Sequence, residues 1–552
     1  MAEISHIATT RKLRLPSIWS VGAIVIALPI AVPLLSIVAT LFSEQSEVWI
    51  HLRETVLVEY VLNTVWLLLC VGVIVSVVGI ACAWLVATKE FFGRRVLIWA
   101  LILPFAAPAY VVAYAYADIF TYGSPVAELS QYVFGAIPSI RSLPGAALVL
   151  GFTLYPYVYL FAYNAFAEQG RPLMEAASTL GASPTRRFAQ VALPHARPAI
   201  AGGIALALME TAADFGVVDF FGVPTLTNGI FRTWYAQGEH QAAMQLAGWL
   251  FAIVVILVVL EQLARRGSHA NPVSRNTAAP RQRLEGWRSA LACLVCALPV
   301  LLGLLVPGAV LLGHALETGD PQFTGAGGAF IGYVSNSLMV GVIAAFVAVL
   351  CAIWLTYATR LLRDQKTILR YSIRTATLGY AIPGMVLAVG LIGPLTSFDR
   401  WLAELLAEQF DIRAGLILTG SAAVLIFVYV ARFIAVAFNS CEGGMAQIHP
   451  NYDHAARSLG AGSFRLLKEI HLPIMTPAAL TAMLLVFVDV IKELPATLIL
   501  RPFNFETLAT RAYRLASDER IAEASTAALL IVLVGLVPAG LAAWQNFGQR
   551  KA

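Results

Sequence analysis

Long apolar runs separated by short polar segments dominate the chain. A helix that spans a bilayer needs about 20 mostly apolar residues, and twelve runs are long enough. They cover residues 18–41, 61–87, 96–120, 145–167, 199–221, 244–264, 289–313, 333–358, 375–396, 415–438, 479–500 and 523–545. In lipid each run must be helical, because open strand edges would leave backbone groups without partners. The pattern predicts an all-α polytopic membrane protein with twelve transmembrane helices.

Composition supports a bilayer as the main solvent. Of the 552 residues 59% are hydrophobic and 12% are charged, whereas soluble domains carry about 25% charged residues. The formal net charge is +5. The basic residues lie in short loops between apolar runs instead of forming one dense basic face, which argues against nucleic-acid binding.

The distribution of Lys and Arg predicts the orientation. With the N-terminus in the cytoplasm, the cytoplasmic segments hold 26 of the 37 basic residues and the outer loops hold 9. The positive-inside rule therefore places both termini in the cytoplasm. The last outer loop is the exception, with Arg501, Arg511, Arg514 and Arg520.

The chain contains an internal repeat. Residues 175–199 and 454–478 align without a gap at an offset of 279, and YVLNT at 60–64 matches YVSNS at 333–337. Pro108 and Pro383 also lie alike in the third spans of their halves. We therefore expect two similar six-helix halves of the same topology, 1–264 and 289–552, joined by a polar cytoplasmic linker at 265–288.

Each aligned segment lies between the fourth and fifth spans of its half, on the predicted cytoplasmic side. A short helix rich in small residues is followed by a glycine, Gly181 or Gly460, which permits a turn with positive φ. A second stretch follows, which we expect Pro194 and Pro473 to terminate. A helix–turn–helix present once in each half suits the docking of a two-fold partner.

These segments resemble the EAA motif of the permeases of ABC importers, of the type I-like architecture. The first copy, in loop 172–198, fits the motif at five positions, which are Glu175, Ala176, Ala177, Gly181 and Pro194. The second copy, in loop 446–477, has His454 in place of the glutamate and matches at Ala455, Ala456, Gly460 and Pro473. That departure leaves open whether both halves bind their ATPase equally.

The resemblance implies a set of partners. Each EAA loop would insert a coupling helix into one of two copies of a separate ABC ATPase subunit, and a periplasmic or lipoprotein substrate-binding protein would deliver cargo to the permease in a bacterial inner membrane. The chain itself would be no enzyme and would hold neither cofactor nor metal. In agreement, none of its six lysines follows a glycine, so it lacks the G-K-[ST] phosphate loop that binds ATP.

Two acidic pairs lie in the fifth spans at the repeat offset. Glu210 and Asp214 match Asp489 and Glu493, and a spacing of four places each pair on one helix face. Charged side chains inside a membrane are costly and usually functional, so one interpretation is an acidic translocation path for a cation. The other interpretation is structural, in which Lys492 neutralises a neighbour or the acids cap a helix break.

Two stretches suggest the cargo. Residues 492–525 and ETAADFG at 210–216 are similar to the corresponding regions of fused ferric-iron importer permeases. By that resemblance the cargo is iron(III). Permeases for thiamine and polyamines share the architecture and remain alternatives. A secondary transporter driven by an ion gradient is a more distant alternative, against which the duplicated EAA loops argue.

Overall fold

The computed structural model describes most of the chain as helix. The residues described are 18–43, 46–135, 139–168, 177, 179–265, 281–324, 328–362, 366–411 and 415–548. Within them the strands are two-residue segments, β1 (Lys89–Glu90) and β2 (Gln282–Arg283), which pair in parallel. This pairing attaches the end of the predicted linker to the first half, whereas residues 266–280 of the linker lie outside the described residues.

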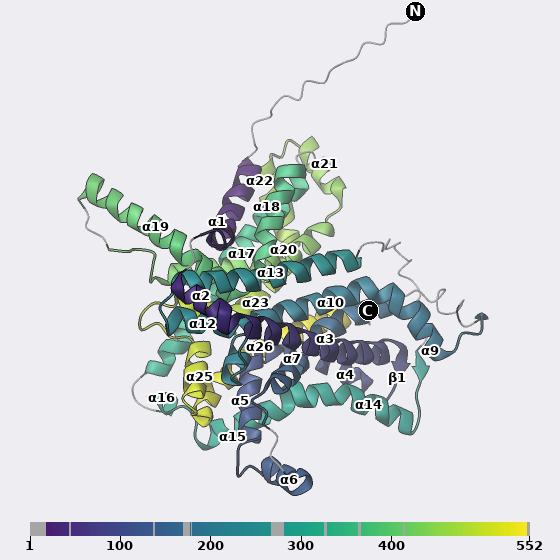
Figure 1. Ribbon diagram of the computed structural model, residues 1–552. Coiled ribbons are helices and arrows are strands. Elements are labelled where there is room, and N and C mark those ends of the chain that lie inside the picture. The colour runs from purple at the N-terminus through teal and green to yellow at the C-terminus, as the bar shows by residue number, and fades with distance from the viewer. Residues whose placement is uncertain are drawn as a thin grey trace, which may run out of the picture.

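The long elements follow the predicted order of spans (Figure 1). In the first half they are α1 (Ile18–Thr40), α3 (Leu57–Thr88), α4 (Arg94–Ala100) with η1 (Leu103–Ala106) and α5 (Ala109–Ile119), α7 (Leu143–Glu168), α9 (Pro184–Arg187) with η2 (Phe188–Ala192) and α10 (Leu193–Ala213), and α13 (His240–Arg265). In the second half they are α14 (Trp287–Val300) with η3 (Leu301–Leu305) and α15 (Val306–Glu317), α17 (Ala329–Leu361), α18 (Lys366–Leu378) with η4 (Gly379–Ala381) and α19 (Gly384–Phe410), α20 (Ala422–Ala446), α22 (Ser463–Leu466) with η5 (Leu467–His471) and α23 (Leu472–Ile491), and α26 (Ile521–Gly548).

Short helices occupy the connections between these spans. They are α2 (Glu47–Thr55), α6 (Pro125–Phe134), α11 (Gly216–Phe220), α12 (Leu226–Tyr235), α16 (Pro321–Thr324), α21 (Pro450–Ser458), α24 (Pro495–Leu500) and α25 (Leu508–Ser517). In the described part of the chain, eleven helices are long and apolar enough to cross a membrane, and twelve if a bent pair counts as one span. The all-α prediction is confirmed.

The third spans are broken, which the apolar pattern alone does not reveal. The run expected at 96–120 bends by 93° between η1 and α5, and Pro108 occupies the N-cap of α5. Pro383 occupies the N-cap of α19 in the same way. Proline lacks the N–H that a continuous helix needs and clashes with the preceding turn, so the repeated prolines explain the repeated break.

The fourth span of the second half begins and ends later than expected. It was predicted at 415–438, but α20 covers Ala422–Ala446. The buried carboxylate of Asp399 accepts hydrogen bonds from the backbone N–H groups of Ile417, Leu418 and Thr419, at 2.9, 3.0 and 2.7 Å. These bonds hold the segment as a loop around Asp399 and prevent it from joining the helix.

The expectation that Pro194 and Pro473 terminate the stretch before the fifth span is wrong. The helix continues through both prolines, and π-helical turns, Phe188–Ala192 and Leu467–His471, lie directly before Leu-Pro. A π turn shifts the backbone hydrogen bonds from i−4 to i−5. We infer that the wider turn accommodates the missing proline donor without ending the helix.

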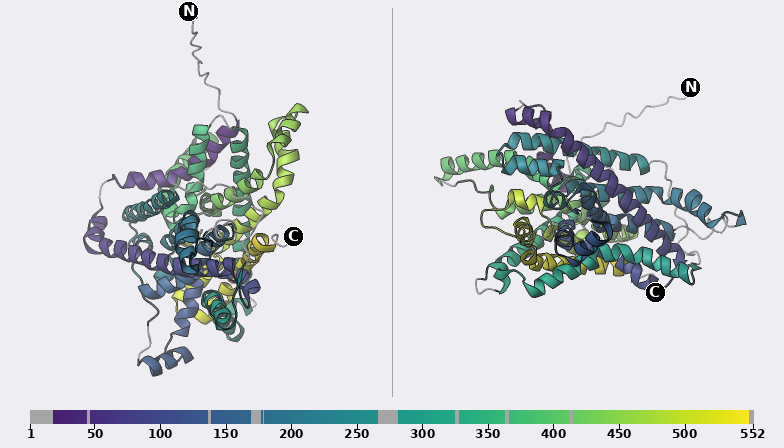
Figure 2. Two further views of the ribbon diagram at one scale, coloured as in Figure 1. Left: turned by 90° about the vertical axis from the view of Figure 1, so that its right-hand side faces the viewer. Right: turned by 60° about the horizontal axis from the view of Figure 1, so that its bottom comes forward.

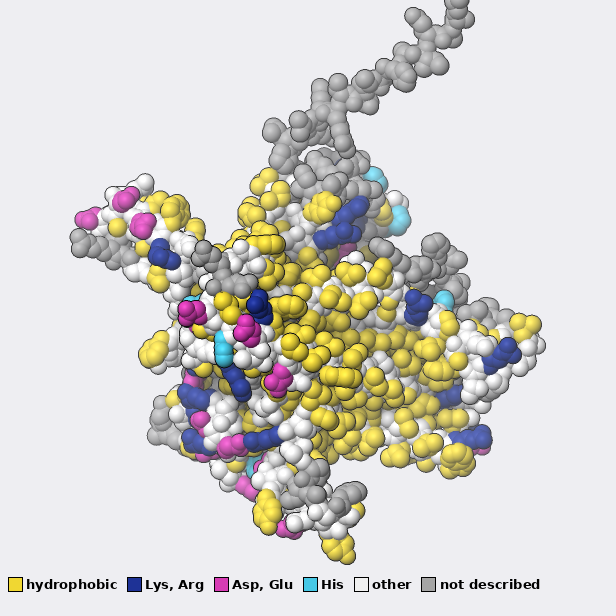
Figure 3. Space-filling view, viewed as in Figure 1, with side chains coloured by type: hydrophobic (Ala, Val, Ile, Leu, Met, Phe, Trp, Pro, Cys, Tyr) yellow, Lys and Arg dark blue, Asp and Glu magenta, His cyan; other side chains and the backbone are white. Residues whose placement is uncertain are grey.

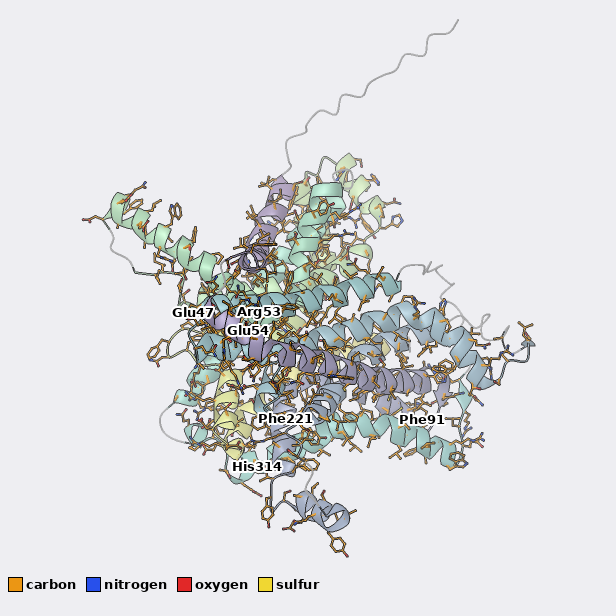
Figure 4. The ribbon with its side chains drawn as sticks, in the orientation of Figure 1. Glu47, Arg53, Glu54, Phe91, Phe221 and His314 are labelled. Carbon is orange, nitrogen blue, oxygen red and sulfur yellow. The ribbon has the colours of Figure 1, made fainter. Side chains whose placement is uncertain are left out.

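The polar connections lie at two opposite sides of an apolar body. In Figure 1, α9, β1 and α21 lie toward the right and top, whereas α2, α12, α16 and α25 lie at the left. Figure 4 places Glu47, Arg53 and Glu54 at the left and Phe91 at the right. A broad hydrophobic surface lies between charged groups at the two edges in Figure 3, as expected for a protein surrounded by lipid.

The two halves exchange their first spans. The N-terminal helix α1 packs against α17, α18 and α19 of the second half, as the views in Figures 1 and 2 show. In turn, α14 and α15 pack against α3, α4 and α5 of the first half. The ring of Trp19 in α1 contacts the rings of Trp354, Tyr357 and Phe464 of the second half, edge-on at Tyr357 and tilted at the other two. Each half is therefore held by a helix of the other, and the junction between them encloses the site described next.

Candidate translocation site and coupling loops

The fifth span of the first half stops partway, and an acidic side chain caps the short helix that follows. Helix α10 ends at Ala213. One carboxylate oxygen of Asp214, Oδ2, then accepts hydrogen bonds from the backbone N–H groups of Val217 and Val218, at 3.0 and 3.4 Å, in the first turn of α11. Such bonds satisfy N–H groups that have no partner inside the helix.

The second half repeats this arrangement with a longer side chain. Helix α23 ends at Ile491, and Glu493 accepts hydrogen bonds from the backbone N–H groups of Ala496 and Thr497, at 3.2 and 3.3 Å. The Thr497 hydroxyl donates a further bond to Glu493 Oε2 at 3.1 Å. Asp214 and Glu493 thus make the capping contacts of the structural interpretation, which leaves their role in transport a separate question.

A cavity lies between the two breaks, at the junction of the halves. All four acidic residues identified in the sequence, Glu210, Asp214, Asp489 and Glu493, line it together with Arg432 and Lys492. It holds about 790 Å³ of empty space, including the part open to solvent. We call it the central cavity. The broken third span contributes as well, through residues 105 and 107–110, so discontinuous helices from both halves meet here, as they do at the sites of many transporters.

Two basic side chains form ion pairs with three of the acids. Arg432 Nη1 lies 2.8 Å from Glu493 Oε1, and its Nη2 lies 3.5 Å from Glu210 Oε2. Lys492 Nζ lies 2.8 Å from Asp489 Oδ1 and 4.2 Å from the ring centroid of Phe105. The structural interpretation of the sequence included neutralisation of a neighbour by Lys492, as found here, but the sequence did not indicate a partner for Arg432. An arginine inside an apolar run was the available signal.

Further contacts join the halves, one at the wall of the cavity, which Tyr157 lines, and others on the predicted outer side. The hydroxyls of Tyr157 and Tyr380 lie 3.1 Å apart. On the predicted outer side, Tyr513 donates to Asp219 at 2.7 Å, and Arg141 forms two bonds of 2.8 Å with Glu519. The Arg141 bond is the main reason why the pKa of the Glu519 carboxyl lies below its usual value. In this structure the outer ends of the halves are therefore joined.

The second EAA loop, 446–477, is attached to the membrane helices through one carboxylate. Asp453 of α21 bonds Nε and Nη2 of Arg360 on α17, at 2.7 and 3.1 Å, and Nε2 of His471 at 2.9 Å. Partial burial alone would raise the pKa of Asp453, but its bonds to Arg360 and His471 hold that pKa below the usual value. The acid beside His454 therefore points inward, where it joins α21 to two helices.

The turns at Gly181 and Gly460 have the same geometry. Gly181 and Gly460 have φ of 76° and 80°, as the sequence predicted. In each copy the residue after the glycine donates its N–H to the carbonyl five residues earlier at 3.0 Å, Ala182 to Ala177 and Ala461 to Ala456. This is the pattern of a Schellman turn, which favours glycine at the left-handed position. Glu175 and Ala176 of the first copy lie outside the described residues.

The repeated N-T and N-S pairs near the start of the second spans hold the outer loops. Asn63 donates to the Pro224 carbonyl and Asn336 to the Glu506 carbonyl, both at 3.0 Å. Thr64 and Ser337 accept the first backbone N–H of α12 and α25, at 3.1 and 2.8 Å. The match between 60–64 and 333–337 thus corresponds to the same loop anchor in both halves.

The basic residues of the last outer loop are paired with acids. Arg511 forms two hydrogen bonds of 2.9 Å with Asp320. Arg501 and Arg514 both contact Glu506, and Arg520 contacts Glu523. These four arginines, which depart from the positive-inside distribution, therefore form ion pairs that stabilise the outer loops.

Comparisons with known proteins agree with this architecture. The model of the family described as "Binding-protein-dependent transport system inner membrane component" matches residues 76–262 and again residues 348–551. The Fe(3+)-transport system permease protein FbpB 2 of Haemophilus influenzae is 26% identical over 538 residues, which cover 95% of this chain and 98% of that protein.

Sulfate permease proteins are also similar, over shorter stretches. The sulfate transport system permease protein CysT of Escherichia coli is 32% identical over 149 residues, 26% of this chain and 52% of that protein. The CysW protein of the sulfate transport system of Synechocystis is 28% identical over 207 residues, 36% of this chain and 73% of that protein. The two family matches, one in each half of a polytopic helical chain, identify this protein as a fused member of the binding-protein-dependent transport system inner membrane component family, the permeases of ABC importers.

Proposed function

We propose that this permease imports iron(III) and that the cargo crosses between the halves through the central cavity. One observation carries the cargo assignment: the likeness to the Haemophilus influenzae Fe(3+)-transport permease extends over 95% of this chain and 98% of that protein. The Escherichia coli sulfate permease matches only 26% of this chain. Because the similarity to the Fe(3+)-transport permease covers both halves, it also covers the residues at their junction, where we place the path.

The chemistry of the central cavity supports a cationic cargo. Its lining contains four carboxylates and two basic groups. Carboxylate oxygens are suitable partners for hard, highly charged metal ions. Charged groups inside a membrane protein are costly to bury and usually have a function. An excess of acids at the junction of the halves therefore favours a positive cargo over a negative one.

The transport cycle that we propose is alternating access driven by another subunit. Two copies of an ABC ATPase would bind the loops 172–198 and 446–477 on the cytoplasmic side, where both chain termini would also lie. A cargo-binding protein, periplasmic or a lipoprotein, would dock on the outer loops. ATP-driven closure of the ATPase pair would move α21 and, through Asp453, the helices α17 and α23. This chain would make and break no covalent bond.

The test is reconstitution of the permease with its ATPase and binding protein in proteoliposomes. We expect ATP-dependent uptake of radiolabelled iron(III), with no uptake of labelled sulfate, thiamine or polyamine under the same conditions. Uptake of one of these three in place of iron would overturn the cargo assignment. Uptake that continues unchanged after ATP depletion would instead indicate a transporter driven by an ion gradient.

A further inference from the structure

The basic groups of the central cavity come only from the second half. At the 279-residue offset of the repeat, Arg432 corresponds to Thr153 and Lys492 to Ala213, and both of these also line the cavity. The acids, by contrast, are equally distributed, with Glu210 and Asp214 in the first half and Asp489 and Glu493 in the second half. The second half therefore balances its own acids, whereas the first half contributes two carboxylates and no base.

Arg432 is firmly attached to its own half. Its side chain is 7% exposed, and its short bond is to Glu493, which is 2% exposed and fixed by the N-terminus of α24. Gly384, also of the second half, lies so close to Arg432 and Glu493 that a Cβ there would clash with both. When the halves separate, Arg432 is therefore expected to remain with Glu493.

The contact of Arg432 with the first half is the weaker one. Nη2 lies 3.5 Å from Glu210 Oε2, compared with 2.8 Å for the bond to Glu493. The Nε donor of Arg432 is buried and has no hydrogen-bond partner among the described residues. A buried guanidinium with an unsatisfied donor is an arrangement that needs an explanation, and a partner exchange during the transport cycle supplies one.

We propose that Arg432 is an exchangeable counter-ion for Glu210, the residue that selects for positive cargo. In the joined state Arg432, which also pairs with Glu493, offsets part of the charge of Glu210 across the halves. Separation of the halves withdraws Arg432 and leaves Glu210 and Asp214 as an acidic face without a base, which attracts a cation and repels an anion. Cargo and Arg432 thus compete for the same carboxylate. This inference rests on the proposed path through the central cavity.

The experiment uses the complete complex of permease, ATPase and binding protein in proteoliposomes, and it measures two quantities. One is ATP hydrolysis in the absence of binding protein, which reports how easily the halves separate. The other is uptake of iron(III) with saturating loaded binding protein. The variants are Arg432→Gln, Arg432→Lys, Glu210→Gln and the exchanged pair Glu210→Arg/Arg432→Glu. Glu285→Gln, in an exposed ion pair with Arg283 outside the cavity and outside both loops, is the control.

Arg432→Gln and Glu210→Gln should each raise ATP hydrolysis in the absence of binding protein by about fivefold. This is the change expected in the equilibrium between joined and separated halves when one modest interaction is lost. Arg432→Lys should stay close to the unmodified complex, because it keeps the charge. Glu210→Gln should lower iron uptake as well. The exchanged pair should return hydrolysis toward the unmodified value without restoring uptake, because its first-half face is basic.

Several results would overturn the inference. If ATP hydrolysis is unchanged in both Arg432→Gln and Glu210→Gln, the Arg432–Glu210 pair does not hold the halves together. Full iron uptake by the exchanged pair would mean that the acid on the first half does not matter. If Arg432→Gln fails to assemble, two other variants decide the question. Glu210→Gln retains Arg432 itself, and Arg432→Lys retains its positive charge. An unmodified complex that carries sulfate and no iron would refute the proposed cargo, yet the hydrolysis measurements would still test the counter-ion.

Discussion

Replacing Asp453 by Asn should release helix α21 of the second EAA loop from the membrane helices. In α21 the described side chains are exposed except those of Asp453 and Ala456, so apolar packing contributes little to holding the helix in place. Asp453 instead forms three bonds, two to Arg360 and one to His471, at distances of 2.7–3.1 Å. The Arg360 and Asp453 side chains are only 9% and 17% exposed.

The expected magnitude follows from these exposures. Removing one partner of a buried ion pair costs about 3–5 kcal/mol, and the residual exposure of Asp453 places the loss near the lower figure. A loss of about 3 kcal/mol corresponds to roughly a 100-fold change in an opening equilibrium. Hydrogen exchange of the α21 amides, measured on the purified permease in nanodiscs by mass spectrometry, should therefore accelerate by about 100-fold in Asp453→Asn.

A matched control lies on the same loop. Glu469 forms an i,i+4 pair with Arg465 at 2.9 Å, and both side chains are more than half exposed. Such exposed pairs contribute only about 0.3–0.5 kcal/mol, so Glu469→Gln should leave the exchange of α21 nearly unchanged. Equal protection of α21 in the Asp453 variant and in the unmodified protein would refute the role that we assign to this carboxylate.

The same carboxylate gives a pH dependence with a definite sign. Because its bonds hold the pKa of Asp453 below the usual value in the folded state, it contributes stability in full above the ordinary aspartate pKa of about 3.9. That contribution declines as the pH falls further, through the lowered folded-state pKa. In the unmodified protein the protection of α21 from hydrogen exchange, corrected for the intrinsic exchange rate, should decline over that acidic range. In Asp453→Asn the protection should not change with pH over the same range.

Three further substitutions test other parts of the structure. Gly460→Ala should cost about 1–2 kcal/mol and weaken ATPase binding in a pull-down, because φ is 80° there, whereas Gly462→Ala, at φ −74° with equally open space, should be neutral. Gly384→Ala should place a methyl group against the Arg432–Glu493 ion pair of the second half and reduce uptake at normal assembly. Asn336→Ala should lose about 1 kcal/mol, seen as faster exchange in α25, because the bond that anchors the preceding loop is removed.

The sequence predicted the architecture well because apolar length and repetition are strong signals. Two family matches and the helical spans confirm the repeated design. It placed the breaks less well, because hydropathy does not register where a helix bends. The 93° bend before α5 depends on Pro108, and the late start of α20 depends on the distant carboxylate of Asp399, 18 to 20 residues before the amides that it binds.

The site was predictable in its acids but not in its pairing. The repeat offset identified Glu210 and Asp489 as equivalent, and the structure brings both to one cavity. Their partners differ: Arg432 of the other half for Glu210, and the neighbouring Lys492 for Asp489. A contact between helices of different halves leaves no periodic trace along the chain, so only the three-dimensional arrangement shows it.

Uptake of iron(III) by the double variant Asp214→Asn/Glu493→Gln is the most direct test of transport through the central cavity. Amide side chains keep an oxygen that can accept the capping bonds of α11 and α24, so the helices and the assembly with the ATPase should survive while two negative charges leave the cavity. We predict that ATP-dependent uptake by the assembled complex falls by at least about tenfold, the effect of roughly 1.4 kcal/mol. Uptake at the unmodified rate by a normally assembled complex would contradict the account.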